Sequence, residues 1–264
     1  MNSGATPRVI DTSKCIGCCK CVNECVNRYL TLSTNGDGKT VASFVSRGRC
    51  LECGHCNAIC PQGAISGGKV ATESIDEQDE LLSLMGKKRS VRKYIKGSVI
   101  PQNIMEKILL AGQSAPTNRN RKSARIVLIK DALPTVYDKA LDYLVSEVQK
   151  TGTINPLYVP TMRMNEDRTT VLWNAEYLVL FVGLVQNTVD AAISAERMQL
   201  EAYKYGIGSA YRGDMQEAIN NTEELRKILD IKMNEQVLIS FVLGQTEIEY
   251  QKPAVKFNRK VVYK

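Results

Sequence analysis

The chain has 264 residues, and its apolar content of 44% is enough for a hydrophobic core, which excludes a disordered chain. The net charge of +7 is partly local, in residues 87–96, and lacks the interleaved aromatic residues of a single-stranded nucleic-acid surface. No apolar run reaches the ~20 residues that span a bilayer. We therefore expect a cytoplasmic protein of two domains, without nucleic-acid or membrane partners.

Eight cysteines near the start of the chain form two copies of one spacing, Cys-x2-Cys-x2-Cys-x3-Cys. The first copy consists of Cys15, Cys18, Cys21 and Cys25, and the second of Cys50, Cys53, Cys56 and Cys60. This spacing is typical of sites for two [4Fe-4S] clusters, in which the fourth cysteine of each run binds the other cluster. We therefore assign one cluster to Cys15, Cys18, Cys21 and Cys60, and the other to Cys50, Cys53, Cys56 and Cys25.

The exchange of the fourth cysteine has a steric reason, because three thiolates on one tight turn can bind three irons but a fourth would strain that turn. A disulfide framework is disfavoured, since nothing marks the chain as secreted and Cys19 is left over, as a small filler. Zinc ribbons usually combine two neighbouring ligands with two distant ones. Residues 8–65 thus resemble the bacterial two-cluster ferredoxins, except that Val26 stands where the motif usually has proline.

The predicted domains are residues 1–68 for the ferredoxin-like part, 69–79 for a linker and 80–264 for a second domain. In the first domain, the sequence Asn-Gly-Asp-Gly at 35–38 predicts a turn between two short strands.

Hydrophobic periodicity predicts alternating elements in the second domain. Helices are expected at about 76–85, 101–113, 131–150, 188–205 and 222–229, and strands at 124–129, 177–184 and 235–243. The segment 154–170 receives no prediction. The tail from 244 has no core pattern of its own, so we expect it to lie on another part of the protein, such as a partner subunit.

Three separated stretches of this domain resemble the nitroreductase family of flavoproteins. Residues 89–94 resemble its Arg-Ser-x-Arg-x-aromatic opening, residues 115–120 its Ala-Pro-Ser-x-x-Asn loop, and residues 206–209 its Gly-Leu-Gly-Ser turn. The resemblance implies an α+β fold with a central, mainly antiparallel sheet flanked by helices. It also implies a homodimer with FMN at the subunit interface.

The residue chemistry agrees with such a cofactor, because guanidinium forks and a hydroxyl hold a phosphate dianion well. Arg89, Ser90 and Arg92 supply these groups within four residues. By resemblance, the cofactor contacts also include Pro116, Thr117, Asn118 and Asn120 from the second subunit, Gly208, Ser209 and the basic tail residue Lys256. The family's Gln-Pro-aromatic sequence is replaced here by Lys-Ser-Ala at 122–124, which puts the usual substrate-side wall in doubt.

The resemblance further implies a backbone N–H group against the flavin N5 atom, which by position belongs to Arg212 or Gly213. The guanidinium of Arg212 either favours an anionic reduced flavin or substrate, or points to solvent. His55 is the only histidine, and it lies between two cluster cysteines. A histidine acid or base in the second domain is therefore excluded, and no side chain is predicted to be catalytic in its own right.

The predicted function is an iron–sulfur flavoprotein oxidoreductase. Electrons from a low-potential donor such as ferredoxin pass through two [4Fe-4S] clusters to FMN, which reduces a nitroaromatic, quinone or enone acceptor. Two alternatives stay open: an electron-transfer or redox-sensing module without turnover, and a flavin-dependent dehalogenase or dehydrogenase of a specific metabolite. The chain lacks a Gly-x-Gly-x-x-Gly nucleotide fingerprint, which favours the clusters as the place where electrons enter.

Overall fold

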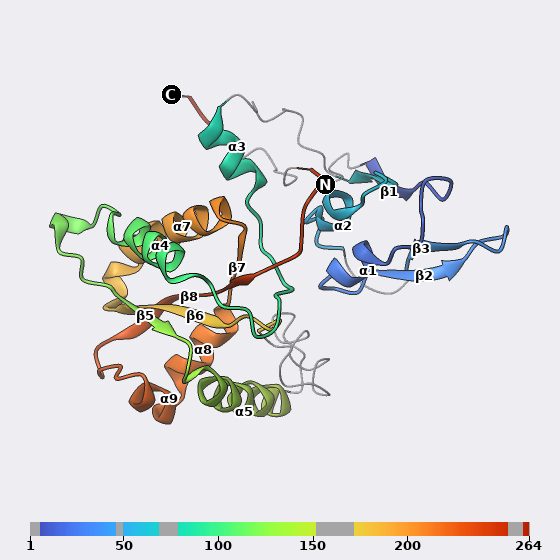
Figure 1. Ribbon diagram of the computed structural model, residues 1–264. Helices are drawn as coiled ribbons and strands as arrows, with labels where there is room; N and C mark the ends of the chain where they lie inside the picture. Colours follow the sequence, from blue (N-terminus) through green and yellow to red (C-terminus); the bar gives the residue numbers. More distant parts are fainter. Residues whose placement is uncertain (1–5, 46–49, 69–78, 152–171, 253–260, 264) are drawn as a thin grey trace. The chain divides into compact units, whose positions relative to one another are not determined.

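The structure is a computed structural model that describes residues 6–45, 50–68, 79–151, 172–252 and 261–263. The chain forms two compact units, which we call unit 1 (residues 1–88 and 248–264) and unit 2 (residues 89–247) (Figure 1). The last residues of the chain therefore group with the cysteine-rich part, although the predicted boundaries put them in the second domain.

Unit 1 contains two antiparallel strand pairs and two short helices. Strand β1 (Thr6–Ile10) pairs with β4 (Ile65–Gly68), and β2 (Leu30–Thr34) pairs with β3 (Thr40–Phe44). The predicted turn lies between β2 and β3, where the Asn35 side chain accepts the backbone N–H groups of Asp37 and Lys39. Helices α1 (Lys20–Glu24) and α2 (His55–Ile59) each run up to the last cysteine of a run.

The two halves of unit 1 repeat one another with an offset of 35 residues, the separation of Cys15 from Cys50. The repeat extends to the backbone, because Gly17 (φ 65°) corresponds to Glu52 (φ 54°), and Cys19 (φ 62°) to Gly54 (φ 73°). A Cβ atom on Gly17 would lie 2.7 Å from the carbonyl oxygen of Thr40, so this turn requires glycine. The repeated cysteine spacing thus folds into a repeated structure.

The chain segment after the last strand of unit 2 packs on unit 1. Ile248 and Tyr250 lie against its apolar core. The Tyr250 hydroxyl donates to Glu24 Oε1 at 2.6 Å, and the Gln251 backbone N–H donates to the Ala58 carbonyl at 2.7 Å. The tail was predicted to lie on another part of the protein; these residues do so within the same chain, not on a partner subunit.

Unit 2 is built on a sheet whose four described strands run in the order β5-β6-β8-β7, with every neighbouring pair antiparallel. The strands are β5 (Arg125–Ile129), β6 (Tyr177–Gly183), β7 (Ile207–Tyr211) and β8 (Gln236–Gln245). Every residue of β6 is buried, as its continuous apolar run predicts.

Helices cover both faces of this sheet (Figure 1). Helices α4 (Gln102–Gln113) and α7 (Thr188–Lys204) lie on one face, and α5 (Leu133–Thr151), α8 (Gly213–Asn221) and α9 (Glu223–Ile228) lie on the other. The predicted α+β arrangement is therefore confirmed for this unit. A Cβ atom on Gly112 would lie 2.6 Å from Met198 Cγ, which shows how closely α4 and α7 pack.

Three elements of residues 79–245 differ from the sequence predictions. Strand β7 and helix α8 were not predicted, because Gly206-Ile207-Gly208 was interpreted only as a turn. Helix α3 (Glu80–Lys87) begins where the Asp79 side chain accepts the Leu82 backbone N–H, and Gly86 lies inside the helix instead of after it. In the described parts of the chain, no helix is long and apolar enough to cross a membrane.

Candidate functional site

The first group of predicted site residues comes together in unit 1. A small pocket is lined by Cys15, Cys18, Cys21 and Cys60, which are the four cysteines assigned to one cluster. Its other walls are mainly apolar, with Ile10, Ala42 and Ile65 among them. The fold therefore brings the last cysteine of the second run to three cysteines of the first.

The thiols of the other quartet are also neighbours. Burial raises the pKa of Cys56, the charge of Arg8 opposes this, and the nearby thiols of Cys53 and Cys25 raise it further. Burial, followed by four neighbouring thiols, likewise raises the pKa of Cys21 to about 12. Cys25 of the first run and Cys56 of the second are thus close enough for their charges to interact, and so are Cys21 and Cys56.

Hydrogen-bond donors surround the sulfur atoms. Backbone N–H groups four residues after the last cysteine of each run donate to it, from Tyr29 to Cys25 at 3.2 Å and from Ala64 to Cys60 at 3.3 Å. The Arg8 Nη1 atom donates to Cys56 Sγ at 3.3 Å. Backbone N–H groups also reach Cys15 from Ala42 and Cys50 from Glu52. Such donors favour sulfur in its thiolate form.

These quartets are not drawn together like the ligands of a single ion. Among the described residues, no three or more His, Cys, Asp or Glu side chains form a group that fits one metal ion. The two [4Fe-4S] clusters therefore stay a prediction from the cysteine spacing. The ninth cysteine, Cys19, lines the same pocket as the first quartet, and its thiol donates to Asn23 Oδ1 at 3.6 Å.

The second group of predicted site residues lies along β7 in unit 2. The Val91 backbone N–H donates to the Ser209 carbonyl at 2.9 Å, and Ser90 forms an isolated parallel bridge with Ser209. The Arg89 side chain is buried, with 6% exposed. Burial raises the pKa of Tyr203 in α7, and the positive charge of the nearby Arg89 partly opposes this. Residues 89–92 are thus fixed against the edge strand.

Two of the residues predicted to contact the cofactor support this segment. A Cβ atom on Gly208 would lie 2.9 Å from the Val91 side chain, so glycine lets the segment approach β7. The buried Ser209 hydroxyl donates to Gln199 Oε1 at 3.0 Å. Sequence reasoning did not identify Gln199, a fully buried amide in α7, because only its tertiary neighbours distinguish it from a surface glutamine.

Arg212 is buried, with 4% exposed, so its side chain does not point to solvent and that alternative was wrong. Its guanidinium pairs with Asp214, with Nε 2.8 Å from Oδ1, and lies 4.4 Å from the centroid of the Trp173 ring. The guanidinium of Arg92 lies 5.8 Å from the same ring. Trp173, which no sequence motif indicated, is half-buried, and the guanidinium groups of both arginines lie over its ring.

The backbone at this turn distinguishes between Arg212 and Gly213 as the predicted N–H donor. The Arg212 N–H donates to the Ser240 carbonyl at 2.9 Å, and the Ser240 hydroxyl donates back to the Arg212 carbonyl. Gly213 is the first residue of α8, where N–H groups lack acceptors within the helix. A Cβ atom on Gly213 would meet nothing within 4 Å. The geometry therefore favours Gly213.

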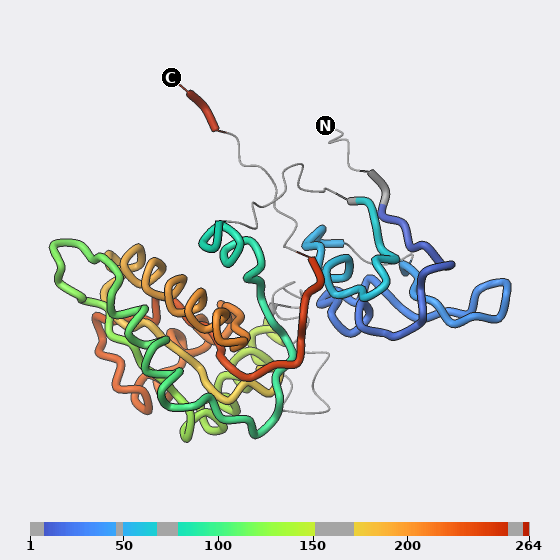
Figure 2. The backbone as a smooth tube through the Cα atoms, turned by 45° about the horizontal axis from the view of Figure 1, so that its top comes forward, coloured from blue at the N-terminus to red at the C-terminus, as the bar shows by residue number. Residues whose placement is uncertain are grey.

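The predicted loop at 116–120 is exposed and held in a strained conformation. Its Asn118 N–H donates to both carboxylate oxygens of Asp190 in α7, at 3.2 and 3.1 Å. Arg119, Asn120 and Lys122 all have positive φ values, between 48° and 54°. Non-glycine residues adopt this conformation rarely, and it is frequent at functional sites. Figures 1 and 2 show the loop at the far end of unit 2 from residues 89–95.

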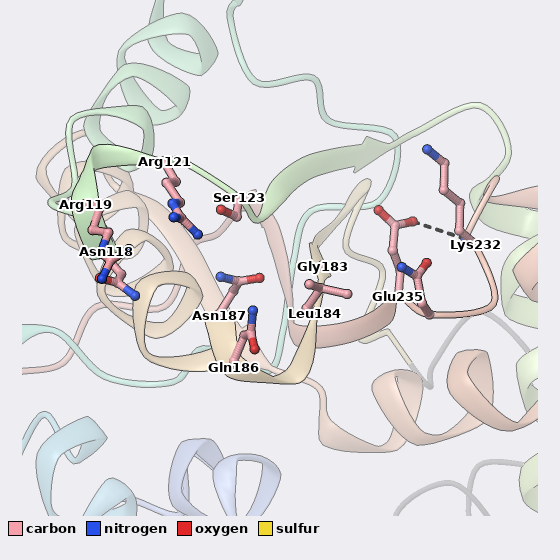
Figure 3. A pocket seen from close by; sticks show the side chains of 11 residues that line it. Asn118, Arg119, Arg121, Ser123, Gly183, Leu184, Gln186, Asn187, Lys232 and Glu235 are labelled. Carbon is pink, nitrogen blue, oxygen red and sulfur yellow. Dashed lines mark hydrogen bonds between the residues drawn. The ribbon is translucent and has the colours of Figure 1, made fainter.

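A cavity of about 570 Å³ opens beside this loop (Figure 3). Arg119, Arg121 and Lys232 line it, whereas the carboxylate of Glu235 is already paired with Arg125 at 3.2 Å. Asn187 also lines the cavity; it is 7% exposed, and its Oδ1 atom has no hydrogen-bond partner among the described residues. The lining is therefore polar and positively charged. Lys256, the last predicted contact, lies outside the described residues.

Comparisons with known proteins cover mainly unit 2. The profile of the nitroreductase family matches residues 85–245, more than half of the chain. No curated protein matches the chain.

Three similar solved structures share the fold. A nitroreductase with bound FMN from Desulfitobacterium hafniense DCB-2 is 21% identical, with a TM-score of 0.57 over 70% of this chain and 98% of that one. A nitroreductase with bound FMN from Bacteroides fragilis NCTC 9343 is 20% identical, with a TM-score of 0.51 over 70% and 95%. A putative NADH dehydrogenase/NAD(P)H nitroreductase from Bacteroides thetaiotaomicron VPI-5482 is 18% identical, with a TM-score of 0.51 over 70% and 97%.

Proposed function

Because the chain belongs to the nitroreductase family, we propose that it is a cytoplasmic iron–sulfur flavoprotein that combines an FMN-dependent oxidoreductase with two [4Fe-4S] clusters. Electrons from a low-potential donor, such as ferredoxin, reach FMN through the clusters, and an organic acceptor is reduced. The observation that carries this proposal is the meeting of Cys60 with Cys15, Cys18 and Cys21 around one pocket. If these positions needed only small apolar side chains, nothing would require the last cysteine of the second run to join three cysteines of the first.

Residues along β7 fit FMN. Arg89, Ser90 and Arg92 would hold the phosphate, since they supply two guanidinium groups and a hydroxyl on a segment fixed to the edge strand. The Gly213 N–H would face the N5 atom, where a donor stabilises the reduced ring. When bound, FMN stores two electrons and delivers them as a hydride, whereas each cluster carries one electron at a time.

The second subunit would complete the flavin site. In one chain, the loop at 116–120 lies at the far end of unit 2 from the segment 89–95, so it would reach a flavin held by that segment from a partner subunit (Figures 1 and 2). The surface for a partner is available, because large apolar side chains on α4, α7 and the turn before α7 are exposed. They are Leu110 (63%), Val185 (62%), Val189 (68%) and Ile193 (38%). A second copy of the chain would cover them.

The acceptor is proposed to be a nitroaromatic, quinone or enone compound. The cavity beside the loop contains three cationic side chains, Arg119, Arg121 and Lys232, which favour an acceptor that carries a negative charge. In the dehalogenase alternative the flavin would likewise pass its electrons to the substrate, whereas in the dehydrogenase alternative the substrate would pass electrons to the flavin. One of the similar structures is named for NADH, but this chain has no nucleotide fingerprint, so reduction through the clusters is preferred.

The cofactor content tests the proposal directly. Protein purified without oxygen should contain about eight irons per chain and show a flavin spectrum. Two zinc ions and no yellow chromophore would overturn both parts of the proposal.

A double variant then tests where the flavin is held. Arg89→Ala with Arg92→Ala should release FMN and leave the iron content unchanged, because both arginines lie in unit 2. The matched control, Lys93→Ala with Lys96→Ala, removes the same charge from exposed positions of the same segment and should retain FMN. Retention of FMN by both variants would show that the phosphate lies elsewhere.

Turnover distinguishes an enzyme from a redox-sensing module. The holoprotein, reduced chemically and mixed with a panel of acceptors, should reoxidise its flavin with at least one of them. If none of the acceptors reoxidises the flavin faster than buffer does, the electron-transfer or sensing alternative is favoured.

A further inference from the structure

Arg8 breaks the symmetry between the two halves of unit 1. Its Nη1 atom donates to Cys56 Sγ at 3.3 Å, across 48 residues of sequence. Cys56 is 8% exposed, so the bond lies in a region that water screens poorly. The Arg8 Nε atom is buried and has no hydrogen-bond partner among the described residues. Among the described residues, the guanidinium thus has the Cys56 sulfur as an acceptor for Nη1 and no acceptor for Nε.

The internal repeat supplies the comparison. With the offset of 35 residues, β1 corresponds to β3, and Arg8 corresponds to Ser43. Neutral donors recur in both halves, since Tyr29 and Ala64 donate to equivalent cysteines at 3.2 and 3.3 Å. The position of Arg8, by contrast, carries a charge in one half and a neutral hydroxyl in the other. The difference between the two halves at this position is thus one positive charge.

We propose that Arg8 makes the two clusters unequal, so that the cluster on Cys25, Cys50, Cys53 and Cys56 has the higher reduction potential. This inference rests on the proposed function. A cluster gains one negative charge when it takes up an electron, and a nearby cation with a hydrogen bond to a ligand sulfur stabilises that state.

The inequality gives electron transfer within unit 1 a direction. Cys15, Cys18, Cys21 and Cys60 would hold the cluster that gives up one electron, and Cys25, Cys50, Cys53 and Cys56 would hold the cluster beside Arg8 that takes it up. No bond forms or breaks, and the low-potential donor supplies the electron. Arg8 acts through Cys56 and is a positioning residue.

A reductive titration of the holoprotein, followed by electron paramagnetic resonance, tests this directly. The unmodified protein should show two one-electron steps. In Arg8→Met, only the step at higher potential should move, to a more negative value. The expected change is about tenfold in the ratio of reduced to oxidised cluster, which corresponds to about 59 mV for one electron. Ser43→Ala should leave both steps in place.

Iron content, measured first, keeps the outcomes distinct. If the unmodified protein holds no clusters, the proposed function fails and not the role of Arg8. If Arg8→Met loses iron, Arg8→Lys retains a charge there and should keep two separated steps, whereas Arg8→Gln should bring them closer together. Movement of the step at lower potential, equal movement of both steps, or no movement would overturn the inference.

Discussion

At the scale of single residues, the ion pair of Arg212 and Asp214 is deeply buried in unit 2. The two side chains are only 4% and 10% exposed, and the guanidinium stacks on Trp173. Two charges in such surroundings depend on each other, because neither can be solvated well by water. We therefore expect the pair to matter for the stability of the turn between β7 and α8.

Replacing Arg212 by methionine tests this role. The variant leaves the Asp214 carboxylate buried without its cation, and we expect a loss of roughly 3–5 kcal/mol in the free energy of unfolding. The hydrogen bonds between the Arg212 backbone and Ser240 remain, so the protein that stays folded should still bind FMN. Denaturant unfolding followed by Trp173 fluorescence measures the free energy of unfolding, and FMN content per chain measures the binding.

The control for this variant is an exposed ion pair. Lys227→Met breaks a pair with Glu223 whose side chains are 73% and 82% exposed. Exposed pairs contribute about 0–1 kcal/mol, so this variant should unfold like the unmodified protein. Equal effects of the two substitutions would mean that burial of the Arg212 pair has no energetic consequence.

The meeting of Cys60 with Cys15, Cys18 and Cys21 was predictable from the sequence, because the fixed spacing positions each run on a short turn. That these cysteines hold iron–sulfur clusters stays a prediction. Trp173 and Gln199 were not identified, since their roles depend on which distant side chains reach them. Arg212 was identified by its position, but only the fold shows that its charge is already paired.

At the scale of elements, the close approach of residues 89–95 to the sheet depends on two glycines, Gly208 in β7 and Gly244 in β8, and Gly208 is the one beside Val91. A Cβ atom at Gly208 would lie 2.9 Å from Val91 and 3.0 Å from Tyr94. In Gly208→Val, the segment must shift, at a cost of about 1–3 kcal/mol. Because Arg89 and Arg92 lie on this segment, we expect FMN to be lost on dialysis while iron is retained.

A glycine with free space around it provides the comparison. A Cβ atom on Gly36 would meet nothing within 4 Å, so Gly36→Val should retain both cofactors. Cofactor content per chain is the measurement. Full retention of FMN by Gly208→Val would show that the position of the segment does not determine flavin binding.

The elements themselves were predictable to different degrees. Long periodic helices such as α4 and α7 were predicted close to their ends, because one apolar stripe faces the sheet throughout. Strand β7 was missed, since its small residues Gly208, Ser209 and Ala210 carry no strand pattern. They are small because the segment from 89 to 95 covers them, and this contact is invisible in a single sequence.

At the scale of the whole molecule, the proposed dimer can be tested on the exposed apolar surface of α7. Val189 is 68% exposed. Val189→Glu would place a charge in the subunit interface, which costs several kcal/mol if the carboxylate is buried there without a partner. We expect monomers by light scattering, together with a loss of FMN, because each site would lack the partner's loop.

A second exposed valine separates this effect from a general change of surface charge. Val99 is 55% exposed and lies outside α4 and α7, so Val99→Glu should remain dimeric and keep its flavin. If Val189→Glu is monomeric but retains FMN, one chain forms the whole flavin site.

The tail that returns to unit 1 gives the last prediction, because it makes the stability of the cysteine-rich unit depend on residues after β8. The Tyr250 hydroxyl donates to Glu24, which is 7% exposed and precedes Cys25, and its ring packs edge-on against His55. Tyr250→Phe keeps the ring and removes only this hydrogen bond. A bond to a charged, buried acceptor contributes about 1.5–3 kcal/mol.

Local opening of unit 1 should therefore become more frequent by a factor of roughly 10 to 100 in Tyr250→Phe, since about 1.4 kcal/mol corresponds to a factor of ten. The measurement is the rate at which an iron chelator bleaches the visible absorbance of the holoprotein. Tyr263→Phe is the matched control, because Tyr263 is 93% exposed. Equal bleaching rates would contradict this role of the tail. Faster bleaching in Tyr250→Phe alone would mean that residues after β8 protect the clusters from solvent.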